Sequence, residues 1–284
     1  MAKIYLALDA VAHRGYNTIY DGLRVSQLVK NYMIMPGKEI RLYFILVSLL
    51  FFFGLDAQEP KVSAGRIVHL DSFSSRFLAA RPIDIWLPPH YSESQPRPVL
   101  YMHDGQMLFD SNTTWNSQEW KVDEIISSIE WDEDRLAPIV IGIWNNGIHR
   151  QSEYFPEKAF RRMSREDRND FLQSSRSQGQ KILSRKPYSD KYLKFLVHEL
   201  KPYIDLEFAT LSDRKHTYIA GSSYGGLISV YALCEYPEVF GGVIAMSTHW
   251  TGVMEHNLPV PTALIDYLDR RLPEGKNHKL YFDH

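Results

Sequence analysis

The chain has 284 residues, enough for one large α/β domain, and its 44% hydrophobic and 23% charged residues are the balance of a globular protein. A formal net charge of -2 gives no support to a nucleic-acid or anionic-membrane partner. The sequence has no CxxC or HExxH motif, so we expect no metal and no cofactor. The single cysteine, Cys234, cannot form an internal disulfide, and we expect it to be a buried, inert thiol.

The most apolar stretch runs from Leu42 to Leu55 and follows Lys38 and Arg41. A basic start, an apolar core of about 14 residues and a small residue before a polar one are typical of a secretory signal peptide. A membrane span needs roughly 20 residues. We therefore predict a signal peptide over residues 38–57, cleaved after Ala57, and a secreted or periplasmic protein without a stable membrane anchor. A buried helix or an anchoring span is the alternative.

Residues 1–37 show no clear periodicity, and we expect them to be extraneous or disordered. A signal peptide belongs at an N-terminus, and Met33 and Met35 lie just before the basic start. We hypothesise that the working protein begins at one of these two methionines.

From Arg66 onward, short apolar runs alternate with longer amphipathic ones. We expect strands over Arg66–Leu70, Ile83–Leu87, Pro98–Met102, Pro138–Trp144, His216–Ala220, Gly242–Met246 and Lys279–Phe282. We expect helices over Glu119–Ile129, over the apolar stripe from Tyr192 to Ile204, over Leu227–Cys234 and over Thr262–Leu272. This alternation predicts the α/β class, with a mostly parallel sheet and helices on both faces.

The stretch Arg161–Lys186 is rich in Arg, Ser, Gln and Asp and poor in large apolar residues. We expect residues 157–190 to form a surface insertion or a mobile lid over the site. A solvated loop without a role is an equal alternative.

The apolar run that ends at Ala220 is followed by Gly221-Ser222-Ser223-Tyr224-Gly225, and a second apolar run begins at Leu227. Strand, Gly-x-Ser-x-Gly and helix, in this order, form a nucleophile elbow. A serine hydroxyl is a weak nucleophile, and the tight turn holds it out toward a base. The helix that follows aims N–H groups at the place where an oxyanion forms. The pattern assigns the nucleophile to Ser223; a Gly-rich turn without chemistry is the alternative.

Sites in parallel sheets lie beyond the C-terminal ends of the strands. The turns after Met102, Trp144, Ala220 and Met246 all fall on that edge of the predicted sheet. This placement predicts one cleft bordered by His103–Gln106, Asn145–Gly147, Ser223 and His249–Trp250.

Further motifs beside the elbow are Val99-Leu-Tyr-Met-His-Asp-Gly-Gln-Met-Leu-Phe-Asp110, Ile141-Gly-Ile-Trp-Asn145, Glu153-Tyr154 and Ser247-Thr-His-Trp250. With them, the chain from about Arg66 to His284 resembles the putative esterase family of α/β-hydrolases, which includes enterochelin esterases, feruloyl esterases and S-formylglutathione hydrolases. The resemblance implies the α/β-hydrolase fold and serine-dependent hydrolysis of carboxylic esters. It matches Ser223 to the nucleophile, and the N–H of Tyr224 with an N–H of Gly105 or Gln106 to the oxyanion hole.

The remaining residues around the cleft have plainer interpretations as well. Trp144, Asn145, His249 and Trp250 are candidates for the substrate pocket, although the tryptophans would also suit core or rim packing. For His103 we favour a packed or hydrogen-bonded turn residue over the catalytic base. Asp104 is expected to cap a turn rather than to act in catalysis.

In α/β-hydrolases the triad runs Ser, then Asp or Glu, then His along the chain. This chain ends at His284, just after the predicted strand Lys279–Phe282. We therefore expect the triad acid and histidine to lie beyond His284, with Asp283 as a further candidate acid. The last strand and helix of the hydrolase fold are expected to be missing from the esterase domain, residues 58–284.

The leading hypothesis is a secreted serine esterase that acts on a small-molecule or glycan-linked ester, with carbohydrate and siderophore esters as candidate substrates. The alternative is a catalytically impaired fragment, or a non-catalytic ligand-binding relative that lacks the triad Asp and His. A membrane-anchored or lid-dependent lipase ranks third, because the apolar segment is short. The sequence does not determine the oligomeric state.

Overall fold

The structure is a computed structural model that describes residues 59–132, 136–175, 179–253, 255 and 257–283. The predicted signal peptide over residues 38–57 and the segment 1–37 lie outside the described residues. Within the described part, none of the helices has the length and apolar character that a membrane span requires.

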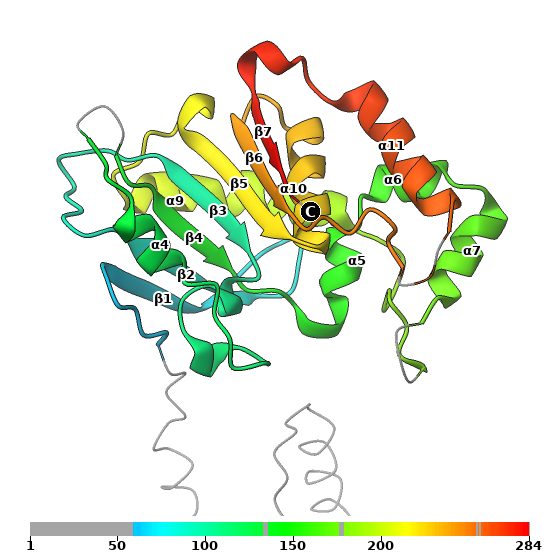
Figure 1. Ribbon diagram of the computed structural model, residues 1–284, viewed down its shortest axis with the longest axis horizontal. Coiled ribbons are helices and arrows are strands. Elements are labelled where there is room, and N and C mark those ends of the chain that lie inside the picture. Colours follow the sequence, from blue (N-terminus) through cyan, green and yellow to red (C-terminus); the bar gives the residue numbers. More distant parts are fainter. Residues whose placement is uncertain (1–58, 133–135, 176–178, 254, 256, 284) are drawn as a thin grey trace, which may run out of the picture. The chain divides into compact units, whose positions relative to one another are not determined.

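A seven-stranded sheet forms the centre of the described part, with strand order β1-β2-β4-β3-β5-β6-β7 (Figure 1). The strands are β1 Arg66–Phe73, β2 Arg81–Leu87, β3 Val99–His103, β4 Ile139–Ile143, β5 Thr217–Ser222, β6 Gly242–Met246 and β7 Lys279–Phe282. The pairs from β4 through β7 are parallel, and β1 and β2 join antiparallel. The predicted mostly parallel sheet is confirmed, and each predicted strand overlaps one of these seven.

The longer helices are α4 Val122–Ser128, α5 Arg150–Tyr154, α6 Glu157–Arg162, α7 Arg165–Gln173, α8 Ser189–Phe195, α9 Lys201–Glu207, α10 Tyr224–Glu235 and α11 Pro259–Arg271. A π-helical stretch, η5 Leu196–Leu200, joins α8 to α9. Short 3-10 helices are η1 Gly105–Met107, η2 Ser111–Thr113, η3 Gly147–His149, η6 Arg214–His216 and η7 Gly275–Asn277. The predicted helix Glu119–Ile129 was too long at its start, because Lys121 has a φ of 56°, which a right-handed helix cannot contain.

Alternate residues of the inner strands face two separate cores, as the pleat of a sheet requires. On one face these strands pack against the helices α8, α9 and α10, with buried residues that include Tyr101, Ile141, Ile219 and Val243. On the other face they pack against α4 and the loop after β3, with buried residues that include Trp86, Met102, Val140 and Ala220. Both faces of the inner strands are therefore covered by apolar groups, which explains their apolar runs, whereas the edge strand β7 is largely exposed.

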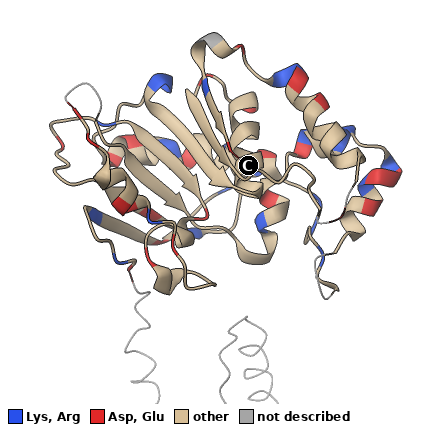
Figure 2. Cartoon of the chain, in the orientation of Figure 1, with Lys and Arg blue, Asp and Glu red and all other residues tan. Residues whose placement is uncertain are grey.

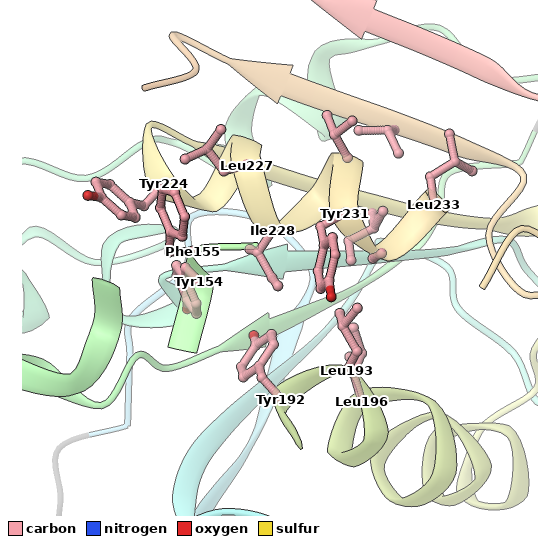
Figure 3. Packing of buried hydrophobic residues seen from close by; sticks show 14 of the residues in the cluster. Tyr154, Phe155, Tyr192, Leu193, Leu196, Tyr224, Leu227, Ile228, Tyr231 and Leu233 are labelled. Carbon is pink, nitrogen blue, oxygen red and sulfur yellow. The ribbon is translucent and has the colours of Figure 1, made fainter. Parts of the chain in front are cut away.

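Helix α10 is buried along its length from Tyr224 to Cys234. Figure 3 shows Ile228 and Tyr231 of α10 facing Tyr192 and Leu193 of α8. Burial of each large apolar side chain stabilises the fold by about 1.5–3 kcal/mol, so this helix is firmly fixed against the sheet. Cys234 is 1% exposed, and burial raises the pKa of its thiol to about 12. The expected buried thiol is confirmed.

The segment 157–190, expected as a surface insertion or lid, folds into α6, α7 and the start of α8. Its polar residues face solvent, while Phe160, Met163, Phe171, Ile182 and Leu183 are buried in the core. The described part of the segment is therefore packed on the domain. Movement of the segment over the site stays a prediction.

Candidate active site

Ser223 lies at the junction between β5 and α10, where the sequence predicts an elbow. Its backbone has a φ of 59° and a ψ of -118°, a conformation that residues with a Cβ rarely adopt. Such a conformation costs on the order of 1–3 kcal/mol and persists only where the surroundings enforce it. The half-buried Ser223 side chain does not cap the helix that follows it. The predicted strand, sharp turn and helix are therefore present.

Two glycines allow close approaches at the elbow, Gly221 between β5 and α10 and Gly226 between α10 and the turn after β6. A Cβ on Gly221 would lie 2.6 Å from the carbonyl carbon of Gly225, and one on Gly226 would lie 2.5 Å from Oγ1 of Thr248. Real Cβ atoms do not approach other atoms so closely, so the turn at Ser223 needs these small residues.

The backbone of Ser223 is held by the turn after β6. Its N–H donates to the carbonyl oxygen of Met246 at 2.9 Å, and its carbonyl oxygen accepts from the N–H of His249 at 3.3 Å. Gly226 N–H, in the first turn of α10, donates to the same carbonyl oxygen at 3.0 Å. Both peptide groups of the strained residue are thus bonded, which fixes where its hydroxyl lies.

The loop after β3 carries the predicted second half of the oxyanion hole. Asp104 adopts the left-handed conformation with a φ of 62°, and Gly105 begins η1. A Cβ on Gly105 would lie 2.5 Å from the carbonyl carbon of Gly142 in β4, so only glycine fits there. The Gln106 side-chain oxygen accepts from the N–H of Asn145 at 3.2 Å. We call this loop, residues 104–107, the oxyanion loop after its predicted role. It rests on the C-terminal end of β4, beside β5.

Asp104 and Arg150 form a bidentate ion pair that the sequence did not reveal. Arg150 Nε and Nη2 each lie 2.6 Å from a carboxylate oxygen of Asp104, and Arg150 Nη2 also donates to the carbonyl oxygen of Ser222 at 3.4 Å. The Arg150 side chain is 16% exposed and the Asp104 side chain is 4% exposed. Burial alone would lower the pKa of Arg150, but the Asp104 carboxylate outweighs burial and raises it. The Asp104 side chain makes no capping hydrogen bond in η1, so the expected turn cap is wrong. With Arg150 it joins the oxyanion loop to the elbow.

Trp144 and Asn145, both candidates for the substrate pocket, already make polar contacts within the protein. The indole N–H of Trp144 donates to Oδ2 of the fully buried Asp84 at 2.5 Å. The amide of Asn145 donates to Oδ1 of Asp104 at 2.8 Å, and its oxygen accepts from Gly147 N–H at 3.0 Å. Contact of either residue with a substrate stays a prediction.

Asp84 is a second buried carboxylate near this loop. Oδ1 of Asp84 lies 2.5 Å from Nδ1 of His69, and the Cβ of Asp84 lies next to Gly142. Burial raises the pKa of Asp84, although the hydrogen bonds from Trp144 and His69 oppose this. The β1–β2 pair thus reaches the oxyanion loop through Asp84 and Trp144.

His249 and Trp250 follow β6, as predicted. The ring of His249 stacks on that of Tyr224, with ring centroids 5.4 Å apart. The ring centroids of Trp250 and Phe282 are 6.0 Å apart. Asp283, a candidate acid, accepts from the backbone N–H of Ser247 at 2.5 Å, so its carboxylate reaches the same turn. His284 and the predicted triad histidine lie outside the described residues.

His103 lies in the core at the end of β3. It is 0% exposed, its Nδ1 is 2.8 Å from the hydroxyl of Tyr192, and its ring centroid is 5.1 Å from that of Tyr154. Burial lowers its pKa to about 3, so the imidazole is neutral at physiological pH. The structure places this histidine under α5 and α8, in the packed position that we favoured. The described residues contain no group of His, Cys, Asp and Glu that could hold a metal ion.

Comparisons with known proteins agree with this geometry. The sequence model of a family described as Putative esterase matches residues 74–261. Two uncharacterized proteins of Bacillus subtilis (strain 168), YjcH and YbbA, are 24% and 28% identical to the chain over 186 and 183 residues. These matches cover 65% and 63% of this chain and 62% and 61% of the relatives, so the chain spans less than two thirds of their length.

Among solved structures, the enterobactin esterase from Shigella flexneri, crystallised in the presence of enterobactin, is similar with a TM-score of 0.52. It is 17% identical, and the match covers 78% of this chain and 46% of that protein. At this level of identity the likeness establishes a shared α/β-hydrolase fold.

Proposed function

Because the chain belongs to the Putative esterase family, we propose that it hydrolyses carboxylic esters with Ser223 as the nucleophile. The observation that carries this proposal is the backbone of Ser223, held at a φ of 59° between β5 and the buried helix α10. A strained turn of this kind exposes a hydroxyl at the end of a parallel sheet, where ligands bind.

In the proposed reaction, Ser223 Oγ attacks the ester carbonyl carbon, and a general base takes its proton. The carbonyl oxygen becomes an oxyanion, for which the N–H groups of Tyr224 and of Gly105 or Gln106 are the proposed donors. Collapse expels the alcohol, which takes up the proton, and leaves an acyl group on Ser223. Water then cleaves this acyl-enzyme and releases the acid. The Asp104–Arg150 pair keeps the two donor-bearing segments in register.

The proposed substrate is an ester linked to a carbohydrate or to a siderophore. The fold shared with an enterobactin esterase supports this class without fixing the acyl or alcohol part. We also propose that the protein is secreted or periplasmic, on the strength of the basic and apolar stretch over residues 38–57. Cell fractionation and N-terminal sequencing test this localisation: protein that stays in the cytoplasm would contradict export, and an exported form that begins upstream of Lys38 would contradict cleavage after Ala57.

Turnover of p-nitrophenyl acetate tests the hydrolysis. We expect Ser223→Ala to lower kcat about 10⁴-fold or more, because losing a nucleophile removes the covalent route. Ser222→Ala is the matched control: it removes a neighbouring hydroxyl that is out of register, and we expect activity within about threefold of the starting protein. A fluorophosphonate probe should add its mass at Ser223. Equal turnover by Ser223→Ala would overturn the assignment. An inactive starting protein would overturn hydrolysis by this chain in favour of the alternative, an impaired fragment or a non-catalytic relative that lacks the triad Asp and His.

A further inference from the structure

A cavity of about 690 Å³ lies on the far side of the segment that supports the oxyanion loop. Its wall includes Phe77, Asn146, His149, Arg185, Lys186 and Tyr188. We call it the basic cavity. Its volume is within the range of about 300–1,000 Å³ that small-molecule sites occupy.

The basic cavity and the active site share one stretch of backbone. Asn146 and His149 line the cavity, while their neighbours Asn145 and Arg150 hold Asp104. The segment from β4 to α5 thus presents one set of side chains to the nucleophile side and another to the cavity. A ligand in the cavity would lie next to the scaffold of the reacting centre.

The lining is strongly biased toward positive charge. Its acidic residue, Glu153, is neutralised by Arg81, whose Nη1 and Nη2 lie 2.8 and 2.9 Å from the Glu153 oxygens. Arg185, Lys186 and Lys191 also line the cavity, and no described acidic side chain forms an ion pair with any of them. The whole chain carries a net charge of -2, so this concentration of cations is opposite in sign to the protein as a whole.

Apolar groups lie beside these cations. Phe77, Leu78 and the buried Pro187 contribute to the wall, and the Arg185 guanidinium sits 5.4 Å from the ring centroid of Tyr188. The hydroxyl of Tyr188 and the amide of Asn146 are both directed to Glu153, at 3.2 and 3.4 Å. The cavity therefore offers cations and an apolar wall together, which suits an organic anion better than a free inorganic ion.

A neighbouring cavity of about 640 Å³, between α6, α7 and Lys186, is also lined by cations. There Arg161 is paired with Glu157, and Arg168 donates to the carbonyl oxygens of Arg161 and Met163. Figure 2 shows both signs of charge interspersed along α7 and α11. We choose the basic cavity because it adjoins the segment whose Asn145 and Arg150 hold Asp104.

We propose that the basic cavity binds the carboxylate-bearing part of an aromatic or apolar organic acid. This binding site lies apart from Ser223 and does not rest on the proposed esterase function. Lys186 and Lys191 are the proposed anion-binding residues, and Tyr188 and Phe77 the proposed contacts for the ring.

Ligand-observed ¹⁹F NMR on the full chain tests the site without any turnover, with 4-fluorobenzoate as the probe and 4-fluorobenzamide as its neutral counterpart. We expect the benzoate to bind about tenfold more tightly at low salt, an advantage that screening at about 0.5 M salt removes. The double variant Lys186→Gln/Lys191→Gln should lose the advantage. Lys194→Gln/Lys215→Gln removes the same charge from exposed lysines outside the cavity, and should keep it.

Equal binding of benzoate and benzamide, or equal loss in the two double variants, would overturn the proposed site.

Discussion

The carboxylate of Asp104 ties together three segments that are far apart in sequence. It accepts from Arg150 through both oxygens and from Asn145, and Arg150 continues to the carbonyl oxygen of Ser222. A buried charge that loses its partner costs much more than an exposed one, because water no longer solvates it. The position of the elbow relative to the oxyanion loop therefore depends on this one pair.

Asp104→Asn would leave the Arg150 guanidinium without its countercharge. We expect the free energy of unfolding to fall by about 3 kcal/mol, as is typical when one partner of a buried pair is removed. Asp213→Asn is the control, since it breaks a pair with His216 in which the Asp213 and His216 side chains are 57% and 40% exposed, and should cost at most about 1 kcal/mol. Urea denaturation measures both. Equal losses would show that the Asp104 pair is no stronger than a surface pair.

His103 should make stability depend on pH. Its pKa is about 3 in the folded protein and 6.5 as the ordinary value. The unfolded chain therefore binds a proton that the folded chain does not, so the stabilising contribution is complete above pH 6.5 and decreases as the pH falls toward 3.

We expect the free energy of unfolding to fall by about 1–2 kcal/mol more in the starting protein than in His103→Gln when the pH drops from about 6 to about 4.5. Urea titrations at both pH values give the two differences. The comparison uses the change with pH and not the absolute stability, because the packing of the substituted side chain is a separate effect. Parallel pH dependence in the two proteins would contradict the burial of a neutral imidazole.

At the scale of elements, the strands were predicted well because each is a short apolar or alternating run. The helices α6 and α7 were not, since each turns only one or two apolar residues, such as Phe160 and Phe171, toward the core. So weak a stripe leaves no detectable period.

Long separations in sequence hid the contacts of Arg150 and Asp84, whose partners are 46 and 60 residues away. The sharp turn at Ser223 was predicted because its motif is contiguous.

The close approaches at the elbow give a prediction for Gly221 and Gly226. Gly221→Ala brings a Cβ against the backbone of Gly225, which cannot rotate away, and we expect a loss of about 2–3 kcal/mol in the free energy of unfolding. Gly226→Ala meets the Thr248 side chain instead. We therefore expect Thr248→Ala to restore much of the stability lost in Gly226→Ala but none of that lost in Gly221→Ala.

Thermal or urea denaturation of these variants decides the point. Gly275→Ala is the control, since a Cβ there meets no atom within 4 Å, and should change stability by about 0.5 kcal/mol or less. An unchanged Gly221→Ala variant would mean that strand and helix are farther apart than the structure has them.

At the scale of the whole molecule, the alternation of strands and helices predicted a mostly parallel sheet and the edge on which the site lies. The strand order could not be predicted in this way, because alternation does not say that β4 lies between β2 and β3. Nor does composition reveal the basic cavity. A net charge of -2 conceals it, since the cavity forms only where the segment that carries Arg185, Lys186 and Lys191 meets η3 and Phe77.

The burial of Cys234 makes the protein a ready host for a spectroscopic label. It is the single cysteine of the chain, it lies inside α10, and its raised pKa keeps it as a thiol at neutral pH. A cysteine introduced at an exposed position outside the cavity, such as Lys194 in the same helix as Lys191, would then be the one fast-reacting sulfur. A fluorophore attached there by maleimide would report occupancy of the basic cavity directly, in a protein otherwise unmodified.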